Sequence, residues 1–168
     1  WDAIRADIPI LLGTWGEQTL HACMGAYQEI KIGGSANPDV VPYFRDLLTR
    51  LGDHDQNVGI ASGAVCVVDE DAATARALAR REVALYLPVV AALDPTLAID
   101  PTLIDRLRAA ADRHDYTAAA ALISDELLAR FAFAGNAHDL ITQTLALHDA
   151  GAQRVEYGTP HGVTAHEG

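Results

Sequence analysis

The feature that most constrains this chain is an alternation between short apolar runs and longer segments of helical periodicity. Apolar runs at residues 8–12, 29–32, 58–68 and 153–157 each end at a glycine or an acidic turn, and helical patterns follow the first three. Such alternation is typical of parallel strands joined by crossover helices. We therefore expect an α/β fold with a parallel sheet, either an open doubly wound sheet or part of a (β/α)8 barrel.

The third strand is followed by more helix than a single crossover needs. A long helix capped by acids at 69–71 and running to about residue 87 comes first, and helical stretches follow at 104–113 and 117–131. A last helix over 137–150 then leads into the final strand. The pattern predicts a helical insertion before the last helix–strand unit.

Composition limits the classes of function. Half of the 168 residues are hydrophobic, which is enough for one domain with a sizeable core, and no apolar run approaches the roughly 18 residues of a membrane span. The net charge of −11 disfavours nucleic acid and anionic lipid as partners. Cys23 and Cys66 lie among apolar neighbours and are expected to be inert thiols in a reducing, cytoplasmic compartment. The sequence opens on Trp1 without a Met and shows no secretory signal, so we expect a stretch of a longer protein.

Three strand ends could carry chemistry, because ligands of parallel α/β folds gather at the carboxyl ends of the strands. The first is the glycine-rich turn 13–16, which runs into a helix start and could offer backbone N–H groups to an anion or phosphate. It matches neither the dinucleotide fingerprint nor a P-loop. The alternative is a tight β-to-α turn without a ligand.

The second strand end combines Gly33, Gly34 and Ser35, small residues that let a ligand approach the backbone; the alternative is a plain turn with a helix cap. The third, 158–162, contains His161, which could contact a ligand, act as an acid–base group, or do neither. We identify no catalytic residue and no metal-ligand set. An enzyme of this kind would therefore leave the reactive chemistry to a cofactor.

Taken together, these segments resemble a known family. Residues 9–20 (PILLGTWGEQTL) resemble the mid-barrel segment of the luciferase-like superfamily, where a similar pattern closes one strand and opens the next helix. Further matches follow in order at 30–34, 66–71 and 133–136, and then at 149–151 with 158–162. The last set is most similar to the deazaflavin-dependent branch, near methylenetetrahydromethanopterin reductase.

The resemblance implies a (β/α)8 barrel that binds coenzyme F420, a deazaflavin, or alternatively FMN. The chain would be its second half, strands five to eight, with residues 1–168 as a single partial domain. The candidate cofactor-binding residues come from the first two strand ends and the helix after the first. They are Thr14, Trp15, Gly16, Gln18, Thr19, Gly33, Gly34 and Ser35. Trp15 and Glu17 depart from the family pattern, and Trp15 could flank the cofactor or cover a helix.

The function implied by the resemblance is hydride transfer between F420 and a small organic or pterin substrate. One alternative is an FMN-dependent monooxygenase on the same barrel. Another is a non-catalytic half-barrel that binds a partner. In each case the open sheet predicts a partner, either a second copy of the chain or the missing half of the barrel.

Overall fold

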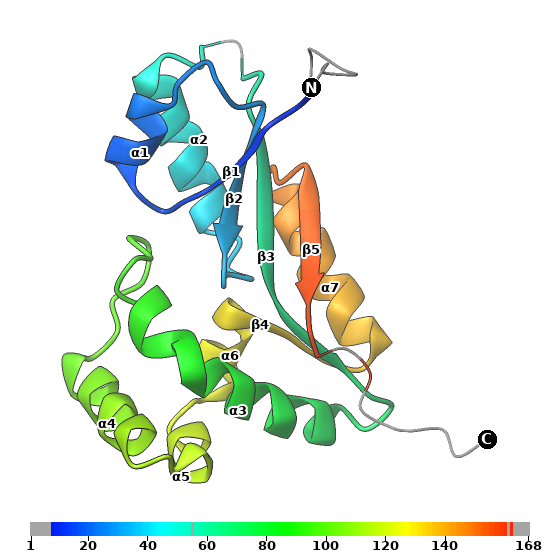
Figure 1. Cartoon of the computed structure of the whole chain (residues 1–168). Coiled ribbons are helices and arrows are strands. Elements are labelled where there is room, and N and C mark those ends of the chain that lie inside the picture. Colours follow the sequence, from blue (N-terminus) through cyan, green and yellow to red (C-terminus); the bar gives the residue numbers. More distant parts are fainter. Residues whose placement is uncertain (1–7, 55, 161, 163–168) are drawn as a thin grey trace, which may run out of the picture.

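A computed structural model describes residues 8–54, 56–160 and 162. Within them the chain forms five strands and seven helices in an α/β arrangement (Figure 1). In chain order these are β1 (Leu11–Gly13), α1 (Glu17–Ala22), β2 (Glu29–Gly33), α2 (Val40–Leu51), β3 (Gly59–Val68), α3 (Ala72–Val90), α4 (Pro101–Asp112), α5 (Tyr116–Ala121), α6 (Asp125–Phe131), β4 (Ala132–Gly135), α7 (Ala137–Asp149) and β5 (Arg154–Gly158).

All named strands pair in parallel, as the alternation predicts. β1 pairs with β2, and β2 pairs with the first half of β3. Residues 61–63 of β3 pair with β2 and with β5 at once, so these two strands lie on opposite edges of β3. The four expected strands are therefore adjacent in chain order, β1–β2–β3–β5, and their carboxyl ends share one edge of the sheet (Figure 1).

The structure contains one strand, β4, that the sequence pattern does not predict. β4 pairs with residues 65–68 of β3, and Val65 pairs with Ala132 of β4 and Gly158 of β5. β4 therefore lies on the opposite side of β3 from β5. This is the side on which β2 pairs with the earlier residues of β3. The sequence of β4, Ala-Phe-Ala-Gly, has no β-branched residue and no alternation. Its strand conformation comes from pairing with β3, a tertiary effect that local propensity does not report.

The first strand also differs from its prediction as a buried strand over 8–12. β1 begins at Leu11, and Ile8, Ile10 and Leu11 are 65%, 52% and 41% exposed. β1 lies at the edge of the described sheet, with only β2 beside it. Within this run Leu12 is partly buried against the first apolar cluster, whereas the described residues leave Ile8, Ile10 and Leu11 largely uncovered.

The insertion is more divided than its periodicity predicts. The expected helix over 117–131 is two helices, because the chain turns after α5 and Ser124 starts α6 by accepting a hydrogen bond from the Leu127 N–H at 3.2 Å. α3 is capped by Asp71, as expected, and continues three residues beyond 87 with Pro88 inside it. No helix in the described part of the chain is long and apolar enough to span a bilayer.

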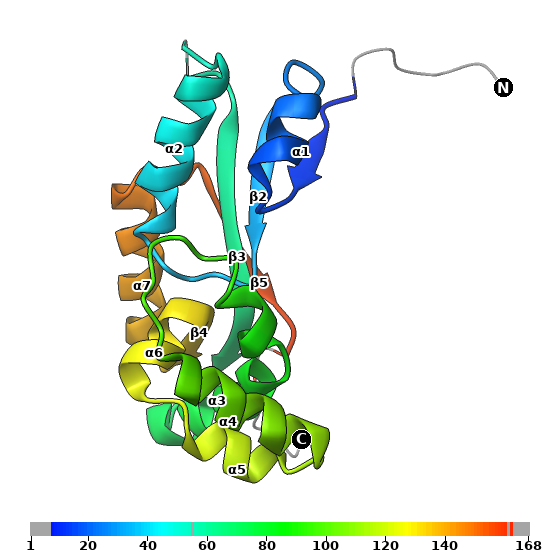
Figure 2. The same cartoon turned by 90° about the vertical axis from the view of Figure 1, so that its left-hand side faces the viewer.

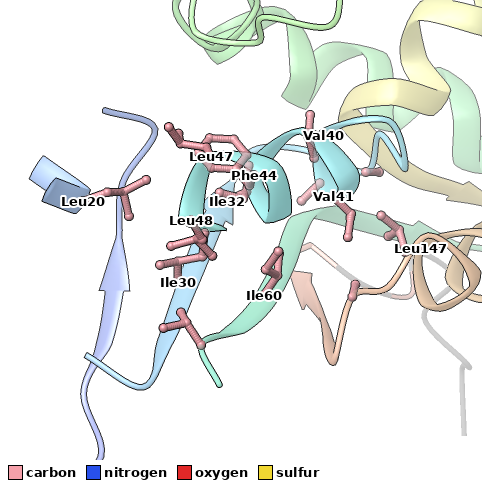
Figure 3. Packing of buried hydrophobic residues seen from close by; sticks show 14 of the residues in the cluster. Leu20, Ile30, Ile32, Val40, Val41, Phe44, Leu47, Leu48, Ile60 and Leu147 are labelled. Atoms are coloured by element: carbon pink, nitrogen blue, oxygen red, sulfur yellow. The ribbon is translucent and has the colours of Figure 1, made fainter. Parts of the chain in front are cut away.

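Two apolar clusters hold the fold together. In the first, the side chains of Ile30 and Ile32 of β2 and Ile60 of β3 meet Phe44 and Leu48 of α2, all fully or almost fully buried (Figure 3). α2 and α7 lie on the same side of the sheet (Figure 2). This layer of helices makes one face of the sheet a dry core.

The second cluster joins α3 to the rest of the insertion and to β4. Val83 and Leu87 of α3 are completely buried with Leu107 of α4 and Phe131 of α6. α3 crosses the carboxyl edge of the sheet in both views (Figures 1 and 2). The insertion thus brings a helix beside the strand ends.

Candidate functional site

The sheet face opposite α2 is charged. Along β2 and β5 the residues that alternate with the core are Glu29, Lys31, Arg154 and Glu156. The Arg154 guanidinium binds Glu29 through two contacts, Nη2 to Oε2 at 2.5 Å and Nε to Oε1 at 3.1 Å. It also lies 3.2 Å from Glu156 Oε1, and Glu156 pairs with Lys31. We refer to these four residues as the ion-pair chain.

β3 lies between β2 and β5, so the ion-pair chain has to cross it. The β3 residues beneath the crossing are small. A Cβ at Gly63 would lie 3.0 Å from Glu156 Cβ and 3.5 Å from Lys31 Cε. Ala61, two residues earlier on the same face, is completely buried. A larger side chain at Gly63 would separate Lys31 from Glu156, so the small residue is required by the ion pair rather than by the backbone conformation.

A hollow of about 510 Å³ lies at the carboxyl ends of β2 and β5, over the middle of β3, and is walled on one side by α3. We call it the strand-end hollow. Its lining comprises Lys31, Gly33 and Gly34 of the β2 end, Gly63, Ala64 and Val65 of β3, Tyr86 and Val90 of α3, and Glu156, Tyr157, Gly158 and Thr159 of the β5 end. Its size is within the range of small-molecule sites.

The two adjacent glycines in this hollow have different reasons to be glycine. Gly34 has φ +77°, and a Cβ there would lie 3.0 Å from Val90 Cγ2. Both facts require glycine without any ligand. At Gly33, by contrast, a Cβ would have no other atom within 4 Å, so the space beside this residue is open. Of the pair, Gly33 is the residue that leaves room for a ligand.

The first strand end is joined to the second. The Thr14 N–H donates to the Lys31 carbonyl at 3.2 Å, and Trp15 Nε1 donates to the Gly33 carbonyl at 3.0 Å. The Trp15 ring packs edge-on against Phe44 of α2, with 5.8 Å between centroids. Trp15 therefore covers a helix, which is one of the two roles that the sequence left open. It also holds the end of β2 through its hydrogen bond to Gly33.

The helix that follows this turn is short. α1 has six residues, and the N–H of Gly16 donates to Thr14 Oγ1 at 3.0 Å. Gly16, Gln18 and Thr19 line a separate hollow of about 820 Å³ together with Glu17, His21 and Leu51. The predicted residues of the first turn thus border a different surface from the strand-end hollow, although the two are linked through Trp15.

Ser35 does not line the strand-end hollow, whereas part of the third strand end does. Ser35 is completely buried, its Oγ accepts from the Asn37 N–H at 3.2 Å, and its carbonyl accepts from Ser62 Oγ at 2.8 Å. Gly158 and Thr159 line the strand-end hollow with Gly33 and Gly34. His161 lies outside the described residues.

Among the residues that line the hollow, Tyr86 has the most strongly shifted pKa. Burial raises the pKa of Tyr86 well above its ordinary value, and its hydroxyl donates to the Phe131 carbonyl at 2.6 Å. Elsewhere, Cys66 is buried, burial raises the pKa of its thiol, and Cys23 is partly buried. In the described ranges no three His, Cys, Asp or Glu side chains group as metal ligands would.

Sequence reasoning did not identify Lys31, Glu156, Tyr86 or Val90 as site residues. A signal was present for the first two. The strands 29–33 and 154–158 place charged residues alternately with apolar ones, whereas a parallel strand covered by helices on both faces is almost continuously apolar. Tyr86 and Val90 reach the hollow only because of how the insertion packs.

The fold is similar to that of known structures, although no family model and no curated protein sequence matches the chain. Among solved structures it is similar to a coenzyme F420-dependent tetrahydromethanopterin reductase from Methanopyrus kandleri, with a TM-score of 0.73 and 20% identity over 95% of this chain and 47% of that one. It is also similar to an F420-dependent secondary alcohol dehydrogenase in complex with an F420-acetone adduct, with a TM-score of 0.57 and 15% identity over 93% of this chain and 43% of that one. The chain spans about half the length of both structures. This chain therefore has the α/β fold of part of these two F420-dependent enzymes, which agrees with the fold that the predicted resemblance implies.

Proposed function

We propose that this chain is part of an F420-dependent oxidoreductase that transfers hydride between the deazaflavin and a small organic or pterin substrate, in the manner of a methylenetetrahydromethanopterin reductase. The observation that carries the proposal is the strand-end hollow with its open backbone at Gly33. Further support is that the chain shares its fold with part of two F420-dependent enzymes. Both similar structures are named for F420, which favours the deazaflavin over FMN.

The residues of the hollow fit a flat ring with a polar rim. Gly33 leaves its face open, and Val90 and Tyr86 supply an apolar wall. When bound, the deazaflavin would supply the hydride chemistry. The chain's own part is to orient the ring against the strand ends and to keep water away from it. Thr14, Trp15 and Gly16, with Gln18 and Thr19, are proposed to hold the phosphate-bearing part of the cofactor, and Gly34 and Ser35 shape the turn beside the ring.

We also propose that the sheet is the second half, strands five to eight, of a (β/α)8 barrel, and that residues 1–168 are one partial domain. The support is the strand order β1–β2–β3–β5 together with the coverage of about half of each similar structure. A barrel of this class needs about 250 residues. The charged face of the sheet would then be completed by the other half of the barrel or by a second copy.

Titration of F420 into the purified chain tests the proposal, with the deazaflavin absorbance near 420 nm and its fluorescence as signals. We expect saturable binding to the wild type and binding at least about tenfold weaker for Gly33→Val, because the new side chain fills ligand space, a loss of about 1.4 kcal/mol. Ala26→Val is the control, since Ala26 is exposed near the amino end of β2 and lines neither the strand-end hollow nor the hollow beside α1.

Three outcomes would count against the proposal. Equal weakening in both variants would place the cofactor elsewhere. Binding of FMN in preference to F420 would favour the monooxygenase, and a stable monomer without affinity for either cofactor would favour a binding module. Gly16→Asp tests the phosphate assignment separately, because it adds a negative charge at the first turn; unchanged F420 affinity would exclude that turn.

A further inference from the structure

A buried amide lies just beyond the strand-end hollow and joins its two walls. Asn37, in the loop between β2 and α2, is completely buried. Its Nδ2 donates to Asp94 Oδ2 at 3.0 Å and to Thr96 Oγ1 at 2.9 Å, and both partners lie in the loop after α3. Its Oδ1 accepts from the Asp39 N–H at 3.1 Å and from Arg130 Nη1 at 2.5 Å. The amide thus has all its hydrogen-bonding capacity in use.

The partners come from distant parts of the chain. Asp94 and Thr96 follow Asn37 by 57 and 59 residues, and Arg130, near the end of α6, follows it by 93. Asp94 is itself 4% exposed and accepts from the Thr96 N–H and hydroxyl at 2.8 and 2.7 Å. The Asn37 side chain therefore connects the loop after β2 to two separate points of the insertion. Because these groups are buried, losing one of the hydrogen bonds would lower the stability of the fold.

The position of this junction relates it to the hollow. Asn37 follows Gly33 and Gly34 closely in the sequence, and Asp94 follows Val90 by a single helical turn. These are the residues through which β2 and α3 face each other, with 3.0 Å between the position of a Gly34 Cβ and Val90 Cγ2. A second link is the Ala36 N–H, which donates to the Arg130 carbonyl at 2.9 Å. The junction therefore connects the loop after β2 to the insertion directly beside the place where the two walls meet.

We infer that Asn37 is a positioning residue, which through Asp94 and Arg130 sets the distance between the β2 turn and α3 and so the width of the strand-end hollow. The consequence for a cofactor rests on the proposed function, whereas the positioning itself does not. The positive φ of Gly34 sets the shape of the turn after β2. The Asn37 amide sets the position of α3 relative to that turn.

The decisive variant is Asn37→Asp, which is nearly isosteric. It replaces the NH2 group with a carboxylate oxygen that faces Asp94 at hydrogen-bond distance, so a donor becomes a repelling charge in a buried place. The double variant Asn37→Asp/Asp94→Asn exchanges the two groups and restores a donor–acceptor pair between the same atoms. Asp53→Asn is the matched control, because Asp53 is also buried (8% exposed) and holds the Asn57 and Val58 N–H groups at 3.0 and 3.2 Å, but away from the hollow.

Hydrogen exchange of the full chain, followed peptide by peptide, measures the positioning without any ligand. We expect exchange about tenfold faster at 33–36 and 86–96 in Asn37→Asp, return toward wild type in the double variant, and no change there in Asp53→Asn. A uniform increase over the whole chain, or no rescue by the exchange of groups, would overturn the inference and leave Asn37 a general stabilising residue.

F420 titration of the same variants separates this inference from the proposed function. Binding about tenfold weaker in Asn37→Asp and restored in the double variant supports both. No binding to the wild type would overturn the proposed function alone, because the exchange pattern still decides the positioning role. Wild-type affinity in Asn37→Asp would overturn the claim that the amide sets the width of the hollow.

Discussion

The two faces of β2 show how one strand can serve two purposes. Toward α2 it presents Ile30 and Ile32, both completely buried in the first apolar cluster. Toward the opposite side it presents Glu29, Lys31 and Gly33, which are partly exposed and belong to the ion-pair chain and the strand-end hollow. Successive residues thus alternate between a dry core and a polar, partly open surface.

The two faces of β2 therefore separate residues that stabilise the fold from residues that could contact a ligand. Changes on the helix-covered face remove packing that nothing else replaces, whereas changes on the open face alter charges that water can solvate. On β2 the residues that line the hollow, Lys31 and Gly33, lie on the second face, where a change of side chain should cost little in folding.

The largest contrast is expected between neighbours on β2. Ile32→Ala should lower the free energy of unfolding by about 2–5 kcal/mol, because it leaves a cavity in a fully buried cluster. Lys31→Ala, one residue away, should cost less than about 1 kcal/mol, because its side chain is 35% exposed. Urea unfolding of both variants measures the difference. Equal losses would mean that the charged face is as fully covered as the core.

A second contrast concerns the two glycines of the hollow. Gly34→Ala should cost at least about 1–2 kcal/mol, because φ +77° strains any L side chain and the new Cβ meets Val90. Gly33→Ala should change stability by no more than about 0.5 kcal/mol, since its Cβ enters open space. Thermal unfolding checks both.

The double variant Gly34→Ala/Val90→Ala separates the two causes of that loss. It should recover the steric part of the penalty and leave the backbone strain. A full recovery would show that φ contributes nothing, and a Gly33→Ala variant as unstable as Gly34→Ala would contradict the open space beside Gly33.

The wall of the hollow on α3 gives a pH-dependent prediction. Burial raises the folded-state pKa of Tyr86 above its ordinary value of 10.0, so the stability it contributes is fully present below pH 10 and is lost as pH rises beyond it. Tyr86→Phe should cost about 1 kcal/mol at neutral pH through the lost hydrogen bond to Phe131 and should reduce the decline above pH 10. Unfolding curves between pH 7 and 11 compare the two proteins; an unchanged alkaline decline would contradict the assignment to Tyr86.

The sequence predicted those parts of the fold that depend on local pattern. The glycines after 8–12 and 29–32, the Asp71 cap and the helical spacing of Val40, Val41, Phe44, Leu47 and Leu48 placed the parallel α/β units. β4 could not be found in this way, because Ala132 to Gly135 become a strand only by pairing with β3. The exposure of β1 depends on what covers it, which a single run of apolar residues does not encode.

The candidate site, like the fold, was predictable only where it depends on local sequence pattern. Gly33, Gly34 and the 158–162 turn could be proposed because strand ends meet at one edge of a parallel sheet, and Gly33, Gly34, Gly158 and Thr159 do line one hollow. Tyr86, Val90 and the Asn37–Asp94 contact bring together residues more than 50 positions apart through the packing of the insertion. No periodicity links those positions, so their roles required the three-dimensional structure.

The smallest expected effect gives the sharpest test of the open face. Glu156→Gln removes the negative charge between Lys31 and Arg154 while keeping the shape over Gly63. With the Lys31, Arg154 and Glu156 side chains 35%, 46% and 28% exposed, water can solvate the cations left behind. The cost should be about 0.2–1 kcal/mol at low salt and should fall further near 1 M salt, where screening acts over about 3 Å. Unfolding at the two salt concentrations measures it. A loss above about 2 kcal/mol that salt does not change would mean that this face is covered in solution, and would favour a second copy closing the sheet over an open site.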